Sequence, residues 1–125
     1  LPEKNKNFLG MTTTIENKMS ANDMAIIARK LVTDYPEVLS TTKVAKSDFR
    51  NTLMTNSNKM LSRLSDYDPN YPVDGLKTGT TDGAGACFTC TMDKNNKRVI
   101  TVILGAQNDN ERFSETKKLL NYSFN

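Results

Sequence analysis

Lys77-Thr78-Gly79 is the stretch whose residue types point most directly to chemistry. It lies within Val73 to Thr80, which has the composition of a strand, and the turn Thr81 to Gly85 follows it. The ammonium of Lys77 could stand beside a nucleophile or a carboxylate, and the hydroxyl of Thr78 could donate to a ligand. Gly79 removes a side chain where another backbone must come close. These residue types suit one wall of an acyl-transfer site that has a serine nucleophile.

The residue census excludes several other kinds of site. The chain has no histidine, so a Ser-His-Asp or Cys-His arrangement cannot be assembled from its own residues. Zinc sites built on histidine are excluded as well. Proton transfer near neutral pH would therefore fall to Lys, Tyr, Asp or Glu with a shifted pKa. We expect no cofactor and no metal site.

Three stretches match serine motifs by spelling: Ser20-Ala21-Asn22, Ser40-Thr41-Thr42-Lys43 and Ser114-Glu115-Thr116-Lys117. Ser20 stands at the start of an amphipathic helical pattern, so we interpret it as a helix N-cap. Ser40 closes a helical turn before a polar segment, and Ser114 falls inside the last predicted helix. We predict that none of these serines is the nucleophile.

Cys87 and Cys90 spell C-x-x-C, which is also compatible with a redox or metal site. They fall in a predicted strand, where residues three positions apart point to opposite faces. We therefore predict that both are buried small side chains. A phosphate-binding loop over Gly75 to Gly85 is a weaker alternative, because the order is K-T-G rather than G-K-[ST] and the turn joins two strands.

The elements that position Lys77 follow from hydrophobic periodicity. A helix is predicted over about 20–34, with Ser20 as N-cap, Asp23 near the capping-box position and an end before Pro36. Its apolar face is Met24, Ile27, Ala28 and Leu31. We expect loop with a short turn over 5–18, a helical turn over 37–40, a short strand over 44–49 and a polar turn over 55–58.

The second half of the chain predicts three sequential antiparallel strands at about 73–80, 86–92 and 98–105. Asp93 to Asn96 forms a hairpin-type turn between the last two. The β-branched run over 98–105 suits a strand that is buried on both faces. A helix follows at about 110–123, capped within Asn108 to Asn110. The order of the elements predicts the α+β class.

Length and charge set the remaining bounds. With 125 residues the chain fits one domain. Its net charge of +3 comes from 17 basic and 14 acidic residues that are interspersed, and the basic residues do not cluster with aromatic ones. No nucleic-acid partner is expected. The sequence has no apolar run near the roughly 18 residues that span a membrane.

The context of Lys77 resembles the D-alanyl-D-alanine carboxypeptidases, which are the low-molecular-mass penicillin-binding proteins of bacterial cell walls. Five stretches carry the resemblance, in the family's order: MSANDMAIIARKLVTDYPEVL, TNSNKML, YPVDGLKTGTTDGAGACFTCT, KRVITVILGA and ERFSETKKLLNYSF. The K-T-G tripeptide is one of the three signature motifs of this superfamily, with S-x-x-K and S-D-N. The implied fold is part of a β-lactamase/transpeptidase-like domain, with a mainly antiparallel sheet and helices on both faces.

The resemblance also implies roles for individual residues. Lys77 would be catalytic, and the backbone N–H of Thr80 would be one of two oxyanion-hole donors. Thr78, Gly79 and Arg112 would bind the substrate, with Arg112 contacting its terminal carboxylate. The implied ligands are peptidoglycan stem peptides ending in D-Ala-D-Ala, and β-lactams. The implied location is extracytoplasmic, at the bacterial cell surface or the periplasmic side of the membrane.

The nucleophilic S-x-x-K and the S-x-N of the family are not found in family context in this sequence. We therefore expect residues 1–125 to be a single domain fragment, the C-terminal part of a serine carboxypeptidase domain, that is inactive alone. Apolar surface left by missing elements would favour self-association or a complementing N-terminal half. The alternative is a non-catalytic module that keeps the K-T-G strand edge for binding peptides or a partner.

Overall fold

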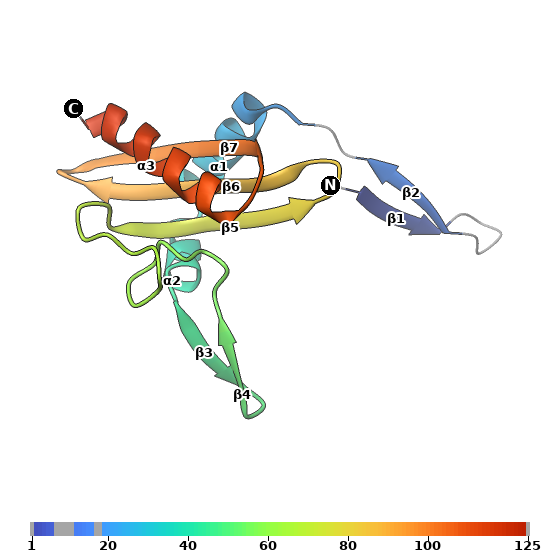
Figure 1. Ribbon diagram of the computed structural model, residues 1–125, viewed down its shortest axis with the longest axis horizontal. Coiled ribbons are helices and arrows are strands. Elements are labelled where there is room, and N and C mark those ends of the chain that lie inside the picture. The colour runs from blue at the N-terminus through green and yellow to red at the C-terminus, as the bar shows by residue number, and fades with distance from the viewer. Residues whose placement is uncertain (1, 7–11, 17–18, 125) are drawn as a thin grey trace.

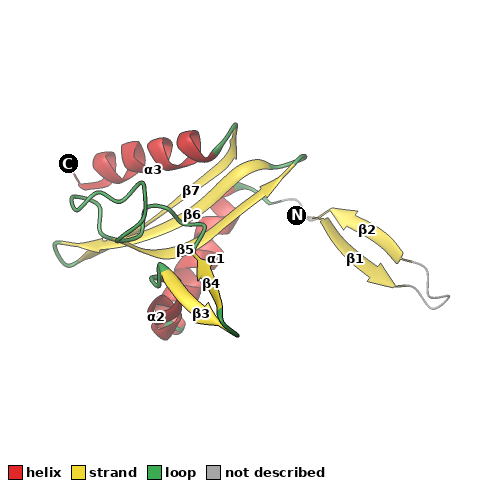
Figure 2. Cartoon of the chain, turned by 60° about the horizontal axis from the view of Figure 1, so that its bottom comes forward, coloured by secondary structure: helices red, strands yellow, loops and turns green. Residues whose placement is uncertain are grey.

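The computed structural model describes residues 2–6, 12–16 and 19–124 of the chain. Its centre is an antiparallel sheet of three strands, β5 (Val73–Thr81), β6 (Gly85–Lys94) and β7 (Lys97–Ala106), in the order β5-β6-β7. The helix α3 (Asp109–Phe124) lies across one face, and α1 (Ala21–Asp34) and α2 (Leu39–Thr42) lie on the other (Figures 1 and 2). This arrangement confirms the predicted α+β class.

The three sequential strands and the last helix are confirmed to within a few residues of the predicted bounds. Between β6 and β7 the chain turns through Asn95 and Asn96, whose φ angles are 56° and 60°. Two successive residues with positive φ are typical of a type I′ hairpin turn, in which asparagine is favoured. At the other end of the sheet, the side chain of Asn108 caps α3 by accepting a bond from the Glu111 N–H at 2.9 Å.

The main core lies between the sheet and α3. It is formed by buried apolar side chains from the loop that precedes β5, from two strands and from the helix: Met60, Leu61, Val73, Phe88, Cys90, Met92, Phe113 and Leu120. The rings of Phe88 and Phe113 meet edge to face, with their centroids 5.3 Å apart. This geometry is favoured by the ring quadrupoles. Within the described part of the chain, no helix has the length and apolar character needed to cross a membrane.

The helix α1 begins as predicted, although its apolar face is only partly buried. Ser20 accepts a bond from the Asp23 N–H at 3.0 Å, and Asp23 accepts one from the Ser20 N–H, which completes the capping box. Ala28 is buried, whereas Ile27 remains 51% exposed. The predicted face was therefore wrong in part: the residues that meet the sheet most closely are Ala28 and Val32.

The structure has two hairpins that the sequence did not predict as such. The segment 5–18, predicted as loop, includes the end of β1 (Pro2–Lys6) and all of β2 (Thr12–Glu16), which pair antiparallel. The predicted strand at 44–49 is β3 (Lys46–Phe49), and it pairs with β4 (Thr52–Thr55). The turn between them falls at Arg50 and Asn51, both with positive φ, and the polar turn predicted at 55–58 follows β4 as an irregular segment with a bend at Ser57. β-branched threonines in β2 and β4 were a usable strand signal.

The helical turn after α1 and the burial of β7 can also be compared with their predictions. The predicted helical turn over 37–40 exists, as a 3₁₀ turn (Pro36–Val38) that leads into α2. The strand β7 was predicted to be buried on both faces, and this was wrong because most of its residues are half-buried or exposed. Leu104 is 41% exposed. Within the described sheet, β7 is an edge strand, so neighbouring elements cover it less completely than β6.

Candidate active site wall

The Lys-Thr-Gly tripeptide lies in the second half of β5, at an edge of the sheet. Among the described strands, β5 pairs only with β6, so no strand lies along its other edge. Lys77 and Thr80 are exposed, whereas Thr78 is buried. A Cβ placed on Gly79 would meet nothing within 4 Å. The strand edge therefore has open space at the position where the sequence predicted the close approach of another backbone.

The start of β5 is held by polar contacts from β7 and from α2. Arg98 donates from both guanidinium nitrogens to the two carboxylate oxygens of Asp74, each at 2.9 Å. This fork-to-fork bond raises the pKa of Arg98 above its ordinary value. The Thr42 hydroxyl of α2 donates to the Asp74 carbonyl at 2.8 Å. These bonds hold the start of β5 in place before the strand reaches Lys77.

The connector Asn56–Lys59 crosses the edge of β5 and contacts the tripeptide directly. The hydroxyl oxygens of Ser57 and Thr78 lie 2.5 Å apart and share a hydrogen bond. The buried amide of Asn58 donates to the Gly75 carbonyl at 3.3 Å. No local pattern in the sequence indicates these contacts, because they join residues 21 and 17 positions apart.

The side chain of Arg112 reaches β5 from α3. The register of the sheet places Lys77 on the opposite face from the one that α3 covers. Its Nη1 donates to the Gly79 carbonyl at 3.2 Å, to the Thr80 hydroxyl at 3.0 Å and to the Cys87 carbonyl at 3.3 Å. The guanidinium lies over the Phe113 ring at 5.2 Å, and the side chain is only 6% exposed. The structure therefore brings Arg112 to Gly79 and Thr80.

Asp109 and Lys59 form the outer end of this cluster. Asp109 pairs with the Nη2 of Arg112 and accepts a bond from the Lys59 ammonium at 2.8 Å. The bond from Lys59 is the main reason that the pKa of Asp109 lies below its ordinary value, with the charge of Arg112 adding to it. The Arg112 charge is balanced by protein groups, and its contact with a substrate carboxylate stays a prediction.

Lys77 has a different environment from Arg112. Its ammonium donates to the carbonyl of its neighbour Thr78, and the side chain is exposed. Exposure leaves the charge free to approach a group that is supplied from outside the described residues. The catalytic role predicted for Lys77 and the oxyanion-hole role predicted for the Thr80 N–H stay predictions, because both need a bound substrate.

The three serines that match serine motifs by spelling make local hydrogen bonds at or within helices. Ser20 caps α1, as predicted. Ser40 donates to the Glu37 carbonyl at 2.6 Å, and Ser114 donates to the Glu111 carbonyl at 3.2 Å. Both of these hydroxyls are exposed and bond to their own helical turns.

The two cysteines lie on β6 in different surroundings. Cys90 is fully buried in the core beside α3, and burial raises the pKa of its thiol far above the ordinary range. Cys87 is half-buried, and its sulfur lies 3.5 Å from the Ala84 carbonyl. The prediction of a buried small side chain is confirmed for Cys90 and only partly met by Cys87.

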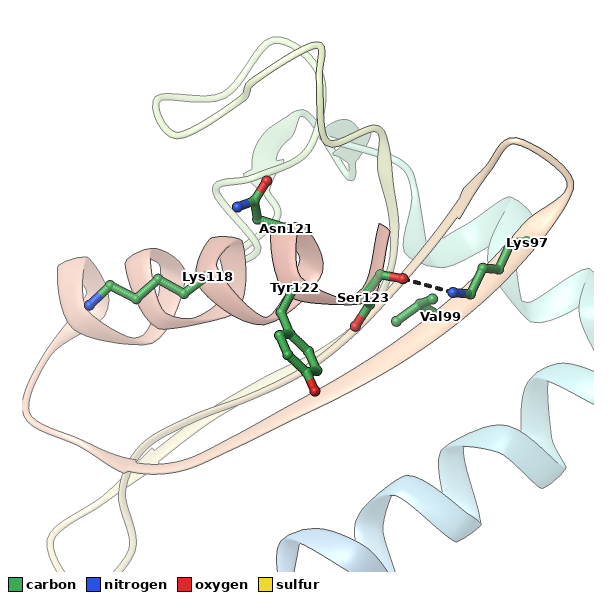
Figure 3. Close-up of a pocket in the computed structure, with 6 residues that line it drawn as sticks. All are labelled: Lys97, Val99, Lys118, Asn121, Tyr122 and Ser123. Atoms are coloured by element: carbon green, nitrogen blue, oxygen red, sulfur yellow. Dashed lines mark hydrogen bonds between the residues drawn. The ribbon is translucent and has the colours of Figure 1, made fainter. Parts of the chain in front are cut away.

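A surface depression on another part of the molecule is distinct from this wall. It lies between β7 and the end of α3, where Lys97 donates to the Ser123 carbonyl at 2.7 Å (Figure 3). Its lining residues are Lys97, Val99, Lys118, Asn121, Tyr122 and Ser123 (Figure 3). None of the residues that the sequence analysis singled out for chemistry takes part in it.

A sheet edge that carries Lys-Thr-Gly, with helices on both faces of the sheet, is the arrangement that the family resemblance implied. Residues 3–108 match the model of the D-alanyl-D-alanine carboxypeptidase family (peptidase S11), and the chain belongs to this family. The predicted resemblance is thereby confirmed.

Curated relatives and solved structures agree with the family assignment. The chain is 37% identical over 105 residues to the D-alanyl-D-alanine carboxypeptidase DacC of Escherichia coli, with 84% of this chain and 25% of DacC covered. It resembles the crystal structure of a peptidoglycan synthesis regulatory factor (PBP3) from Streptococcus pneumoniae, at a TM-score of 0.79 and 45% identity. That match covers 86% of this chain and 31% of the other.

A structure with a bound antibiotic is also similar. It is penicillin-binding protein D2 from Listeria monocytogenes in the cefotaxime-bound form, at a TM-score of 0.74 and 31% identity, covering 95% of this chain and 44% of the other. The chain thus spans about a quarter of the curated relative and less than half of either structure.

Proposed function

We propose that this chain supplies the K-T-G wall of a serine-type D-Ala-D-Ala carboxypeptidase site. The enzyme would trim peptidoglycan stem peptides through an acyl-enzyme and would be acylated by β-lactams, on the extracytoplasmic side of a bacterial membrane. The observation that carries the proposal is the open edge of β5, where exposed Lys77 and unobstructed Gly79 adjoin Thr80. The family membership and the cefotaxime-bound relative support it.

The proposed chemistry assigns one task to each group of the wall. The substrate would lie along β5 by strand addition. A serine from outside these residues would attack the carbonyl of the penultimate D-Ala. The new C–O bond would form while the peptide C–N bond breaks, with a proton passing to the departing D-Ala, and water would then cleave the ester. The Thr80 N–H would donate to the developing oxyanion, which is worth about 3–4 kcal/mol of transition-state stabilisation.

The positive groups of the wall would recognise the substrate's terminal carboxylate. Lys77 would lie close to this carboxylate and to the proton path of the nucleophile. Arg112, held behind Gly79 and Thr80, would add its charge and would orient the Thr80 hydroxyl, whose oxygen accepts from Nη1.

Labelled penicillin tests this proposal. We expect the 125-residue chain to give no covalent adduct, and a longer polypeptide that joins it to a family S-x-x-K segment to give one adduct per molecule. Intact-mass measurement distinguishes the two. A stoichiometric adduct on the 125-residue chain would show that the nucleophile lies within it. No adduct on either polypeptide would favour the alternative, a non-catalytic peptide- or partner-binding module.

The exposed apolar side chains of α1 and of the β3–β4 hairpin favour a covering partner. Ile26 and Phe49 are both 59% exposed, and Leu53 and Met54 have similar values. We propose that the N-terminal half of the catalytic domain covers this surface, or that copies of the chain associate through it. Sedimentation of the 125-residue chain tests this, since a well-folded monomer at all concentrations would contradict it.

A further inference from the structure

Ser57 is a hydroxyl group at the K-T-G edge to which the sequence assigned no role. Its oxygen lies 2.5 Å from the Thr78 hydroxyl, although the two residues are 21 positions apart. Ser57 is exposed, whereas Thr78 is only 7% exposed. A ligand that approaches the strand edge therefore meets Ser57 before it meets the buried threonine.

The orientation of the shared hydrogen bond follows from burial. Among the described side chains, Ser57 is the sole hydrogen-bond partner of the Thr78 hydroxyl. If Ser57 donated, the hydrogen of the buried Thr78 hydroxyl would be left without an acceptor, which is costly. If Thr78 donates, its hydrogen is satisfied, and the Ser57 hydrogen is free to point toward solvent.

The connector holds Ser57 in this place through the residues on either side of it. Asn56 donates from its amide to the carbonyls of Thr42 and Val44, at 3.2 and 3.1 Å. Its amide oxygen accepts a bond from the Asn58 N–H at 2.9 Å. Asn58 itself is tied to β5 through the Gly75 carbonyl. An exposed serine on a backbone that is fixed on both sides has little freedom to leave the edge.

We propose that Ser57 is a substrate-contacting residue, whose hydroxyl, backed by Thr78, donates to the terminal carboxylate of the bound ligand. This inference rests on the proposed function of the K-T-G wall. Thr78 would then act in part through Ser57, because its own hydrogen is used in the pair. A donor that has already accepted a hydrogen bond is polarised and donates more strongly.

The test compares benzylpenicillin with its methyl ester as acylating probes of the full-length protein that contains this chain. A hydrogen bond to a charged group justifies an expected loss of about 10- to 100-fold in the benzylpenicillin acylation rate constant for Ser57→Ala. The rate with the methyl ester should change much less, because the carboxylate charge is missing. Ser57→Thr keeps the hydroxyl and should keep the wild-type ratio of the two rates.

Ser62→Ala is the matched control, because Ser62 is an exposed serine of the same loop. It should leave both rates unchanged. An equal loss on both probes in Ser57→Ala would overturn the proposal in favour of a purely structural role, and wild-type rates would overturn it outright. Wild-type protein that is not acylated at all would instead refute the proposed function, and the carboxylate role of Ser57 with it.

Discussion

Replacing Arg112 by methionine removes the guanidinium that ties α3 to the end of β5. The carbonyl oxygens of Gly79 and Cys87 and the hydroxyl oxygen of Thr80 each lose the hydrogen bond that Nη1 donates. Asp109 loses one of its two cationic partners. Methionine has a similar length and keeps apolar contact with the neighbouring Phe113 ring, so the change isolates the polar part of the interaction.

The expected magnitude follows from burial. Asp109 is 39% exposed and keeps Lys59, so its charge is neither buried nor left unpaired, and the cost comes from the strand oxygens that lose a charged donor. A hydrogen bond to a charged group is worth about 1.5–3 kcal/mol, so the loss should be about 2–3 kcal/mol. Arg112→Lys keeps a charge but loses the fork, and it should fall in between. The T-shaped contact of Phe88 with Phe113 should persist in both variants.

Urea unfolding followed by circular dichroism measures the difference in the free energy of unfolding. Arg29→Met is the control, because Arg29 is exposed on α1 and its change should cost less than about 0.5 kcal/mol. A loss below about 1 kcal/mol in Arg112→Met would refute the reasoning. It would mean that water replaces the guanidinium at the strand oxygens without penalty.

Three further outcomes follow from the same region. The lowered pKa of Asp109 means that its ionised form stabilises the folded protein above the unfolded pKa, and that this stability is lost as pH falls through the folded pKa. Between about pH 5 and 2, the free energy of unfolding should therefore fall more steeply in the wild type than in Asp109→Asn, and equal slopes would contradict the pairing. A Cβ at Gly75 would lie 2.9 Å from the Thr42 hydroxyl oxygen, so Gly75→Ala should lose about 1–3 kcal/mol in urea unfolding. Gly79→Ala has open space and should keep its stability, while penicillin acylation of the full-length protein slows; an unchanged acylation rate would show that no ligand backbone comes close there.

Much of the fold followed from the sequence because its signals are local. The Ser20 capping box and the Asn95-Asn96 turn each involve residues within a few positions of one another. The failures have a common cause. Exposure of Ile27 and Leu104 depends on which elements lie above them, and neither periodicity nor composition contains that information.

The site also has a part that the sequence predicted and a part that it did not. Lys77, Thr78 and Gly79 were found because they are contiguous and because the surrounding stretches resemble a family. The links from Ser57 to Thr78 and from Lys59 to Asp109 span 21 and 50 positions. Such contacts depend on tertiary packing, and a single sequence gives no sign of them.

The rate at which the buried thiol of Cys90 is alkylated reports how often the core of the protein opens. The thiol reacts as a thiolate, and Cys90 is sealed between the sheet and α3, with 0% of its surface exposed. Alkylation under native conditions therefore requires α3 to lift from the sheet or the whole chain to unfold. The labelling rate at increasing urea would separate these two events, since only global unfolding accelerates steeply with denaturant. The same helix carries Arg112, so this measurement would report how often the K-T-G wall loses its support.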